Sequence, residues 1–232
     1  MANSNEQKGA PIAEEALNKS EDFFLKNKKT IIGAVIAVVA IIVAWVCYDM
    51  LIAKPNLEKG RDAIAVGQRY FDNDQMELAV NGDSTDFKGF AALAQEYSGK
   101  NANLANLYNG LAYAQLGKWE QAVEYLEKYK DSGDNMVSPA AEGALGNAYA
   151  YLKKYDEAVK HLLKAAERAD NISLSPNFYI QAGEILESQK KNAEALEAYQ
   201  KAKEYIDRMP QQLQMQLSSM GVNIDGYIER VK

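Results

Sequence analysis

The stretch that decides the fold is GALGNAYAYLKKYDEAVKHLLKAA, residues 143–166, which predicts two amphipathic helices separated at Lys153-Lys154. Two other segments share its pattern: YNGLAYAQLGKWEQAVEYLEKY at 108–129 and IQAGEILESQKKNAEALEAYQKAK at 180–203. A small residue of the first helix and an alanine of the second recur at spacings of 36 and 37, as Gly110, Gly146 and Gly183 and as Ala122, Ala158 and Ala195. Such a repeat indicates an array of stacked helix pairs.

Aromatic side chains recur at two further positions of the repeat. They are Tyr113 and Trp119 in the first unit and Tyr149 and Tyr155 in the second, whereas the third unit has Leu186 and Asn192. A small residue where two helices cross lets their backbones approach, and the aromatics fill the wedge between pairs. These positions resemble those of the tetratricopeptide repeat (TPR) family. The resemblance implies a right-handed α-solenoid of antiparallel helix pairs.

We therefore predict an all-α domain over residues 54–232, because no segment shows a convincing alternation of apolar residues. Its repeats are expected at 103–135, 138–170 and 175–207, with C-terminal capping helices at 208–232. An N-terminal helix pair is expected at 54–99, with one helix over 54–80 and its antiparallel partner over 86–97. Ser138-Pro139 and Ser175-Pro176 each predict an N-cap serine followed by proline at the first helical position.

A different feature precedes the repeats: TIIGAVIAVVAIIVAWVCY, residues 30–48, is nineteen residues long and has no charge. A membrane helix needs about 20 apolar residues, so we predict a transmembrane helix over residues 30–53 after a leader at 1–29. The run is longer than the core of a cleavable signal, and its exit offers no small-x-small cleavage site. Lys26, Lys28 and Lys29 at its entry favour a cytoplasmic leader and a repeat domain on the other side.

The predicted membrane helix carries small residues on one face, at Gly33, Ala37, Ala40 and Ala44. Small residues let membrane helices approach closely, which predicts lateral packing against another membrane helix. The alternative is that small residues are simply common in such helices.

Composition excludes several classes of function. Past Ala53 there are 21 Lys and Arg against 26 Asp and Glu, a net charge of −5 that would repel a phosphate backbone, so we predict no nucleic-acid partner. The one cysteine, Cys47, lies in the membrane helix, which leaves the repeat domain without an internal disulfide. The one histidine, His161, lies on or beside an amphipathic stripe and has no second histidine or cysteine to join it. We predict no catalytic or metal site, no cofactor and no enzyme activity.

The TPR resemblance also implies a concave groove lined by the first helix of each pair. Carrying the family's register over selects Leu104, Leu107, Leu111 and Gln115, then Ala140, Gly143, Asn147 and Tyr151, then Asn177, Ile180, Glu184 and Ser188. This groove lacks the cations with which chaperone-binding TPR domains hold a terminal carboxylate. Its mixed apolar and polar character suits an extended or helical polypeptide. The alternative is that its three leucines pack against the preceding helix pair.

A short leader, one membrane helix and a TPR-like domain together resemble the YfgM-like family of bacterial inner-membrane proteins. The resemblance implies a single-pass protein of the inner membrane with its amino terminus in the cytoplasm and its repeat domain in the periplasm. It implies an ancillary subunit of the Sec translocon. The expected partners are translocon subunits, a membrane-anchored periplasmic chaperone, exported polypeptides and membrane lipid. Two alternatives remain: a scaffold for envelope assembly machinery, and a regulatory anchor whose leader binds a cytoplasmic signalling protein.

Overall fold

The computed structural model describes residues 10–83 and 85–232, so the predicted leader lies partly outside the described residues. Every regular element in the described part is a helix, which confirms the all-α prediction. The chain divides after Glu58 into two compact units.

The first unit is helical and contains the predicted membrane span. Helix α1 covers Ala10–Tyr48 and is followed by a π-helical segment, η1, over Asp49–Ala53. A continuous helix from Leu25 to Asp72 is long and apolar enough to cross a membrane. In η1 the wider turn places Lys54 Nζ 3.1 Å from Asp49 Oδ2, five residues earlier in the chain.

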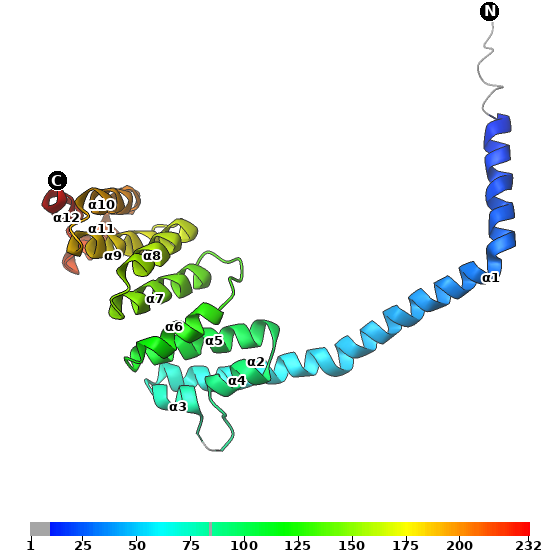
Figure 1. Ribbon diagram of the computed structural model, residues 1–232, viewed down its shortest axis with the longest axis horizontal. Coiled ribbons are helices and arrows are strands. Elements are labelled where there is room, and N and C mark those ends of the chain that lie inside the picture. Colours follow the sequence, from blue (N-terminus) through cyan, green and yellow to red (C-terminus); the bar gives the residue numbers. More distant parts are fainter. Residues whose placement is uncertain (1–9, 84) are drawn as a thin grey trace, which may run out of the picture. The chain divides into compact units, whose positions relative to one another are not determined.

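The second unit is a series of short helices that fold back on one another. Helices α5 to α10 form three successive antiparallel pairs, which give a TPR-like helical repeat fold (Figure 1). The helices are α2 (Lys54–Asp72), α3 (Met76–Asn81), α4 (Phe90–Glu96), α5 (Gly99–Gln115), α6 (Trp119–Lys128), α7 (Val137–Tyr151), α8 (Tyr155–Ala169), α9 (Ser175–Ser188), α10 (Asn192–Asp207), α11 (Gln211–Ser219) and α12 (Ile224–Val231).

The close approach of paired helices depends on the small residues of the repeat. A Cβ on Gly110 would lie 2.6 Å from Leu126 Cγ, and a Cβ on Gly146 would lie 2.9 Å from Leu162 Cγ. The alanines of the second helices, Ala122, Ala158 and Ala195, are fully buried. The structure thus confirms that the repeated glycines and alanines lie at the helix crossings.

One turn geometry links the two helices of every pair. A residue with positive φ is followed by a backbone N–H that donates to the carbonyl five residues earlier, the pattern of a Schellman cap. The residues with positive φ are Asp74, Gly117, Lys153, Lys190 and Gly221. The donor–acceptor pairs are Gln75 and Tyr70, Lys118 and Tyr113, Lys154 and Tyr149, Lys191 and Leu186, and Val222 and Leu217, at 2.8–3.1 Å.

The region before the three predicted repeats differs from the prediction. The single helix expected over residues 54–80 is interrupted at Asp74, where α3 follows α2 through the same turn as in the later repeats; α3 then packs against α4 and α5. Gly67 takes the place of the repeated glycine, with the ring of Phe90 2.5 Å from where its Cβ would lie. Ala79 is fully buried, like the repeated alanines. The partner helix expected over 86–97 is shorter and is α4.

The C-terminal helices α11 and α12 are short, and α12 packs against α10. The side chains of Ile224, Ile228 and Val231 on α12 join the core built by α8, α9 and α10. Helix α11 has no buried residue, and Met215 on it is 62% exposed.

Candidate functional site

The residues predicted to line a groove do not all reach the surface. Gln115, Tyr151 and Glu184 are exposed, and Leu111 and Asn147 are half-buried. Leu107 and Ile180 have only 5% and 7% of their surfaces exposed. These two side chains belong to the core and are not available to a ligand.

The reason is that the fifth position of each first helix faces the core, whereas the other nine predicted positions are exposed or half-buried. Leu107 belongs to a cluster built with α6, α7 and α8, the helices that follow it, and not with the preceding pair. Gly143, at the equivalent place in α7, has the ring of Phe178 2.2 Å from where its Cβ would lie. The sixth positions of these helices, and not the fifth, reach the surface.

We define the A-helix face as the exposed or half-buried side chains of α5, α7 and α9 that repeat at spacings of four, three and four. They are Leu104, Tyr108, Leu111 and Gln115, then Ala140, Ala144, Asn147 and Tyr151, then Asn177, Gln181, Glu184 and Ser188. The face is a mixture of small apolar, aromatic and amide side chains. Partial desolvation raises the pKa of Glu184, although nearby Arg230 opposes that rise.

The polar groups of the A-helix face differ in exposure. Gln115 is exposed and Asn147 is half-buried, whereas Oε1 of Gln181 is buried and has no hydrogen-bond partner among the described residues. At one end of the face the ring of Tyr151 lies flat on that of Trp119, with centroids 3.8 Å apart and planes 2° from parallel. The side of the Tyr151 residue away from the indole is open, since 64% of this residue is exposed.

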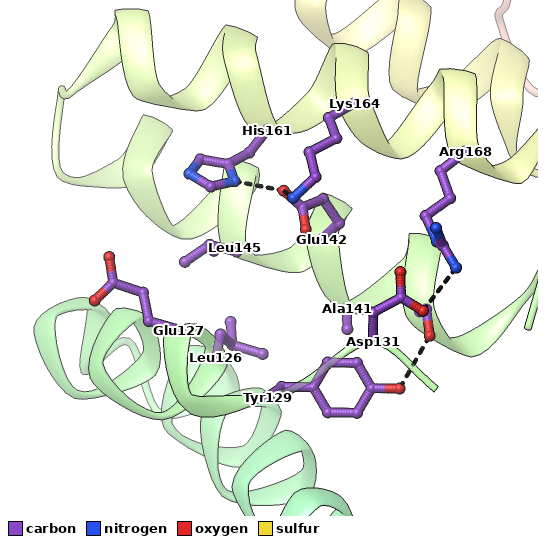
Figure 2. A pocket seen from close by; sticks show the side chains of 11 residues that line it. Leu126, Glu127, Tyr129, Asp131, Ala141, Glu142, Leu145, His161, Lys164 and Arg168 are labelled. Carbon is purple, nitrogen blue, oxygen red and sulfur yellow. Dashed lines mark hydrogen bonds and ion pairs between the residues drawn. The ribbon is translucent and has the colours of Figure 1, made fainter. Parts of the chain in front are cut away.

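A cavity of about 400 Å³ lies between α6, α7 and α8, away from the A-helix face (Figure 2). Glu142 of α7 lies against two side chains of α8: its Oε1 is 2.7 Å from His161 Nδ1 and 2.9 Å from Lys164 Nζ. At the other end Arg168 Nη2 donates to Asp131 Oδ1 at 2.6 Å. The charged groups here are paired within the cavity wall.

Polar contacts around this cavity join α7 to α8 within one pair and α7 to α6 of the preceding pair. Partial burial opposes ionisation of Glu142, but the hydrogen bonds from His161 and Lys164 prevail and lower its pKa. A hydrogen bond to Glu127 of α6, reinforced by burial, raises the pKa of Tyr149 to about 12. The Tyr149 ring also stacks on His161, with centroids 5.3 Å apart. His161 therefore has a structural role, and the described residues contain no cluster that could hold a metal ion.

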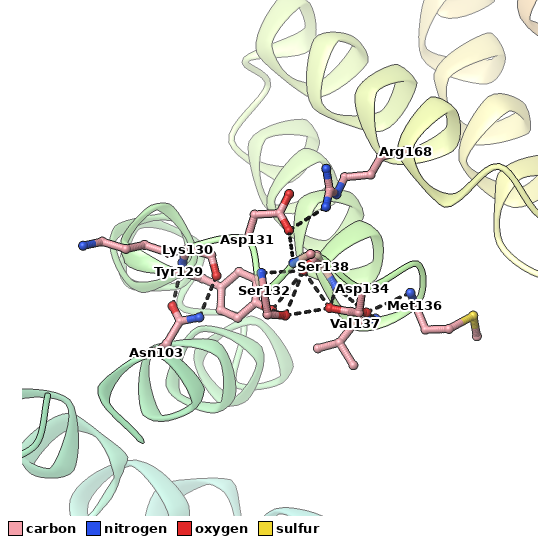
Figure 3. A network of polar contacts seen from close by, with 11 residues as sticks. Asn103, Tyr129, Lys130, Asp131, Ser132, Asp134, Met136, Val137, Ser138 and Arg168 are labelled. Atoms are coloured by element: carbon pink, nitrogen blue, oxygen red, sulfur yellow. Dashed lines mark hydrogen bonds and ion pairs between the residues drawn. The ribbon is translucent and has the colours of Figure 1, made fainter. Parts of the chain in front are cut away.

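The loop between α6 and α7 is held by a network of side chains (Figure 3). Asp134 Oδ1 accepts hydrogen bonds from the N–H groups of Met136 and Val137, so Asp134 caps α7. Asn103 of α5 fixes the start of the loop, because its amide both donates to the carbonyl of Lys130 and accepts from the Lys130 N–H, each at 2.6 Å.

The predicted N-cap serines therefore have a different role. Helices α7 and α9 begin at Val137 and Ser175, so neither Ser138 nor Ser175 is the residue before the helix. Both hydroxyls are buried and accept a backbone N–H from the loop before the helix, Ser138 from Ser132 and Ser175 from Asn171. Loop side chains do the capping because the serine oxygens are used to hold those loops.

The small residues of the predicted membrane helix are exposed. Nothing lies within 4 Å of where a Cβ on Gly33 would be, and Ala37, Ala40 and Ala44 are open along the same face. Packing of this face against another helix stays a prediction.

Antiparallel helix pairs with one repeated turn, small residues at their crossings and an open face on the first helices define a helical-repeat scaffold. A family model described as "Tetratricopeptide repeat-like domain" matches residues 21–222, and the chain belongs to that family. Repeat domains of this kind are typically non-catalytic and bind other proteins, and neither the family nor the structural comparison indicates an enzyme.

Comparison with solved structures supports the same fold. The chain is similar to the one titled "Crystal structure of MamA protein", with 18% identity, a TM-score of 0.53, and coverage of 75% of this chain and 90% of that one. A search of the curated proteins found no significant match.

Proposed function

We propose that this protein is a membrane-anchored scaffold that binds polypeptides and partner proteins on the periplasmic side of a bacterial inner membrane, where it assists the Sec translocon and a membrane-anchored chaperone. The observation that carries the proposal is the joining of a helix long enough to span a bilayer to a TPR-like array with an open face. The anchor confines the array to a membrane surface, so its partners are expected there.

The small-residue face of the anchor supports a second contact within the membrane. Gly33 and Ala37 would allow close packing against a helix of the translocon or of the chaperone. Under this proposal the anchor selects the neighbour and the repeat domain holds the polypeptide.

Photo-crosslinking in intact cells tests the proposal. A photoreactive phenylalanine analogue is placed at Ala37 in the anchor, at Gln115 on the A-helix face, or at Gln200, an exposed residue of α10 that serves as the control. We expect adducts with translocon subunits from Ala37 and with newly exported chains from Gln115, and no adducts from Gln200.

Adducts with other proteins would indicate a different function. Subunits of envelope assembly machinery at Ala37 and Gln115 would indicate an assembly scaffold. A cytoplasmic protein that is lost on deletion of residues 1–29 would indicate a regulatory anchor. Cleavage of the repeat domain by protease added to spheroplasts is expected, and its protection would refute the orientation.

A further inference from the structure

The start of α5 and the loop between α6 and α7 lie side by side. Asn103 of α5 holds the backbone of Lys130 through two hydrogen bonds of 2.6 Å each. We define the basic edge as these two segments, residues 98–103 and 128–137. Lys100, Lys128 and Lys130 line a cavity of about 440 Å³ between them. Lys128 is paired with Glu124, whereas Lys100 and Lys130 are exposed and have no ion pair with a described residue.

The two acidic residues of the basic edge are already used within the protein. Asp131 Oδ1 accepts a hydrogen bond from Arg168 Nη2 at 2.6 Å. Hydrogen bonds from Ser132 and from the first N–H groups of α7 hold the pKa of Asp134 well below its usual range. Lys100 and Lys130 therefore keep their charges without a compensating acid on the edge.

The basic edge is close along the chain to the predicted membrane span. A Cβ on Gly60 of α2 would lie 2.2 Å from Asn101 Nδ2, at the start of α5. Gly60 is seven residues after Ala53, the last residue of the predicted span. A segment of that length reaches at most about 25 Å when fully extended and about 10 Å as a helix. The chain therefore keeps this part of the edge within about 25 Å of the end of the span.

Two exposed apolar side chains belong to the same edge. Met136 and Val137 have 52% and 45% of their surfaces exposed. The side chains of Lys130 and Met136 extend outward on opposite sides of the network that fixes the loop (Figure 3). A partner that meets both must be wide, and it must accept cations and apolar groups together. The surface of a bilayer with anionic headgroups has these properties.

We propose that the basic edge docks on anionic lipid headgroups of the membrane that holds the anchor. Lys100 and Lys130 contact lipid phosphates, and Met136 and Val137 reach the apolar layer beneath them. A lysine suits this contact because its long apolar stem carries the ammonium group to a headgroup. The covalent tether keeps the edge at a high local concentration near the lipid, so a few weak contacts suffice. The inference uses only the membrane anchor of the proposed function and none of its protein partners.

The opposite edge of the domain offers a matched control. Lys153 and Lys190 are exposed in the turns within two pairs, at the far ends of the first helices. Helix α5 has 17 residues and is about 25 Å long, so these turns lie about one helix length from the basic edge. This separation exceeds the Debye length of about 10 Å at 0.1 M salt. The double variant Lys153→Gln with Lys190→Gln removes the same charge as Lys100→Gln with Lys130→Gln.

The test uses the full-length protein in lipid nanodiscs and a fluorescent reporter of the lipid interface. In a Cys47→Ala background, an environment-sensitive nitrobenzoxadiazole label is attached to Asn135→Cys on the basic edge. The control label is attached to Gln121→Cys, near the start of α6. Asn135 and Gln121 are both exposed. The nanodiscs contain phosphatidylcholine alone or with about 30% phosphatidylglycerol, which supplies the anionic headgroups.

In anionic nanodiscs we expect the emission of the label at Asn135 to rise at least about twofold and to shift to the blue, and that of the label at Gln121 to stay unchanged. Lys100→Gln with Lys130→Gln should remove at least about half of the rise, whereas the double variant of the opposite edge should leave it intact. A salt concentration of about 1 M should also reduce the rise, because it shortens the Debye length to about 3 Å.

No change at Asn135 in anionic nanodiscs would overturn the inference. An equal rise in neutral nanodiscs, or an equal loss in the two double variants, would refute recognition of anionic headgroups by this edge. The same rise on adding inorganic phosphate to neutral nanodiscs would assign the lysines to a free anion and not to a lipid surface. These results leave the proposed function open, because the crosslinks from Ala37 and Gln115 decide it. A protein that is not recovered in nanodiscs would refute the anchor, and both proposals with it.

Discussion

Asn109 is a buried residue whose replacement should stabilise the protein. It lies in α5, has no exposed surface, and neither Nδ2 nor Oδ1 has a hydrogen-bond partner among the described residues. The aligned positions in the next two repeats are Leu145 and Ala182, both buried and apolar. We therefore choose Asn109→Leu, which keeps the branched shape of the side chain and replaces its two polar atoms with methyl groups.

The magnitude follows from the cost of a desolvated amide. A buried polar group without a partner costs about 1–3 kcal/mol, and replacing it with an apolar group of the same shape removes that cost. A gain of about 2 kcal/mol in the free energy of unfolding corresponds to a rise of roughly 4–8 °C in Tm for a domain of this size. Asn109→Ala also removes the amide but leaves a cavity, so its gain should be smaller.

The assay is urea unfolding of the full-length protein in detergent micelles, followed by circular dichroism at 222 nm. Because a repeat array need not unfold in one step, the midpoint of the first transition is the quantity to compare. An unchanged or lower midpoint for Asn109→Leu would show that the Asn109 amide has hydrogen-bond partners in solution. The expected gain in stability, which assumes that it has none, would then be wrong.

Three further predictions concern other parts of the chain. Gly146→Val should destabilise the repeat domain by about 1–3 kcal/mol in the same urea assay, because its side chain would overpack against α8. The hydrogen bond to Glu127 raises the pKa of Tyr149 to about 12, so the stability that this bond contributes is complete below pH 10 and is lost as the pH rises through about 12. In a pH series of thermal melts, Tyr149→Phe should remove this part of the pH dependence of Tm. Gly33→Leu with Ala37→Leu should reduce co-purification of membrane partners in mild detergent, whereas two leucines on the opposite face of the helix should not.

Much of the repeat architecture could be predicted because the packing requirement is visible in single residues. Two backbones can cross closely only where side chains are small, so Gly110 and Ala122 recur at a fixed spacing, and their recurrence locates the pairs. The candidate membrane helix could also be predicted, since a charge-free run of nineteen residues is long enough to cross the hydrocarbon of a bilayer.

The first helix pair could not be found by that spacing. From Asp74 to Gly117 the turns are 43 residues apart, because a loop ending at Gly89 and helix α4 are inserted after the short α3. A local signal was present in Gly67 and Tyr70, which match the small and aromatic positions of the first helix. A search by position within the pair, and not by period, would have detected it.

The predicted face was wrong at the fifth position of each first helix for a physical reason. A helix with neighbours on two sides exposes only a narrow stripe, and an error of one residue rotates a side chain by about 100°. Leu107 and Ile180 fell on the buried side of that boundary, whereas Tyr108 and Gln181 are half-buried. Apolar content alone could not separate them, because both sides of the boundary contain leucine, alanine and aromatic residues.

The distribution of charge over the repeats suggests how one array can be both rigid and receptive. Ion pairs such as Arg168 with Asp131 and Lys191 with Asp156 join neighbouring units through the second helices and the loops beside them. The charged residues Glu142 and Glu187 of the first helices lie outside the A-helix face and pair with Lys164 of α8 and Arg230 of α12. The face itself can then remain largely neutral, as it is at Gln115 and Asn147. A scaffold built in this way keeps its amides at fixed separations and places its electrostatic interactions away from the surface that we assign to the ligand.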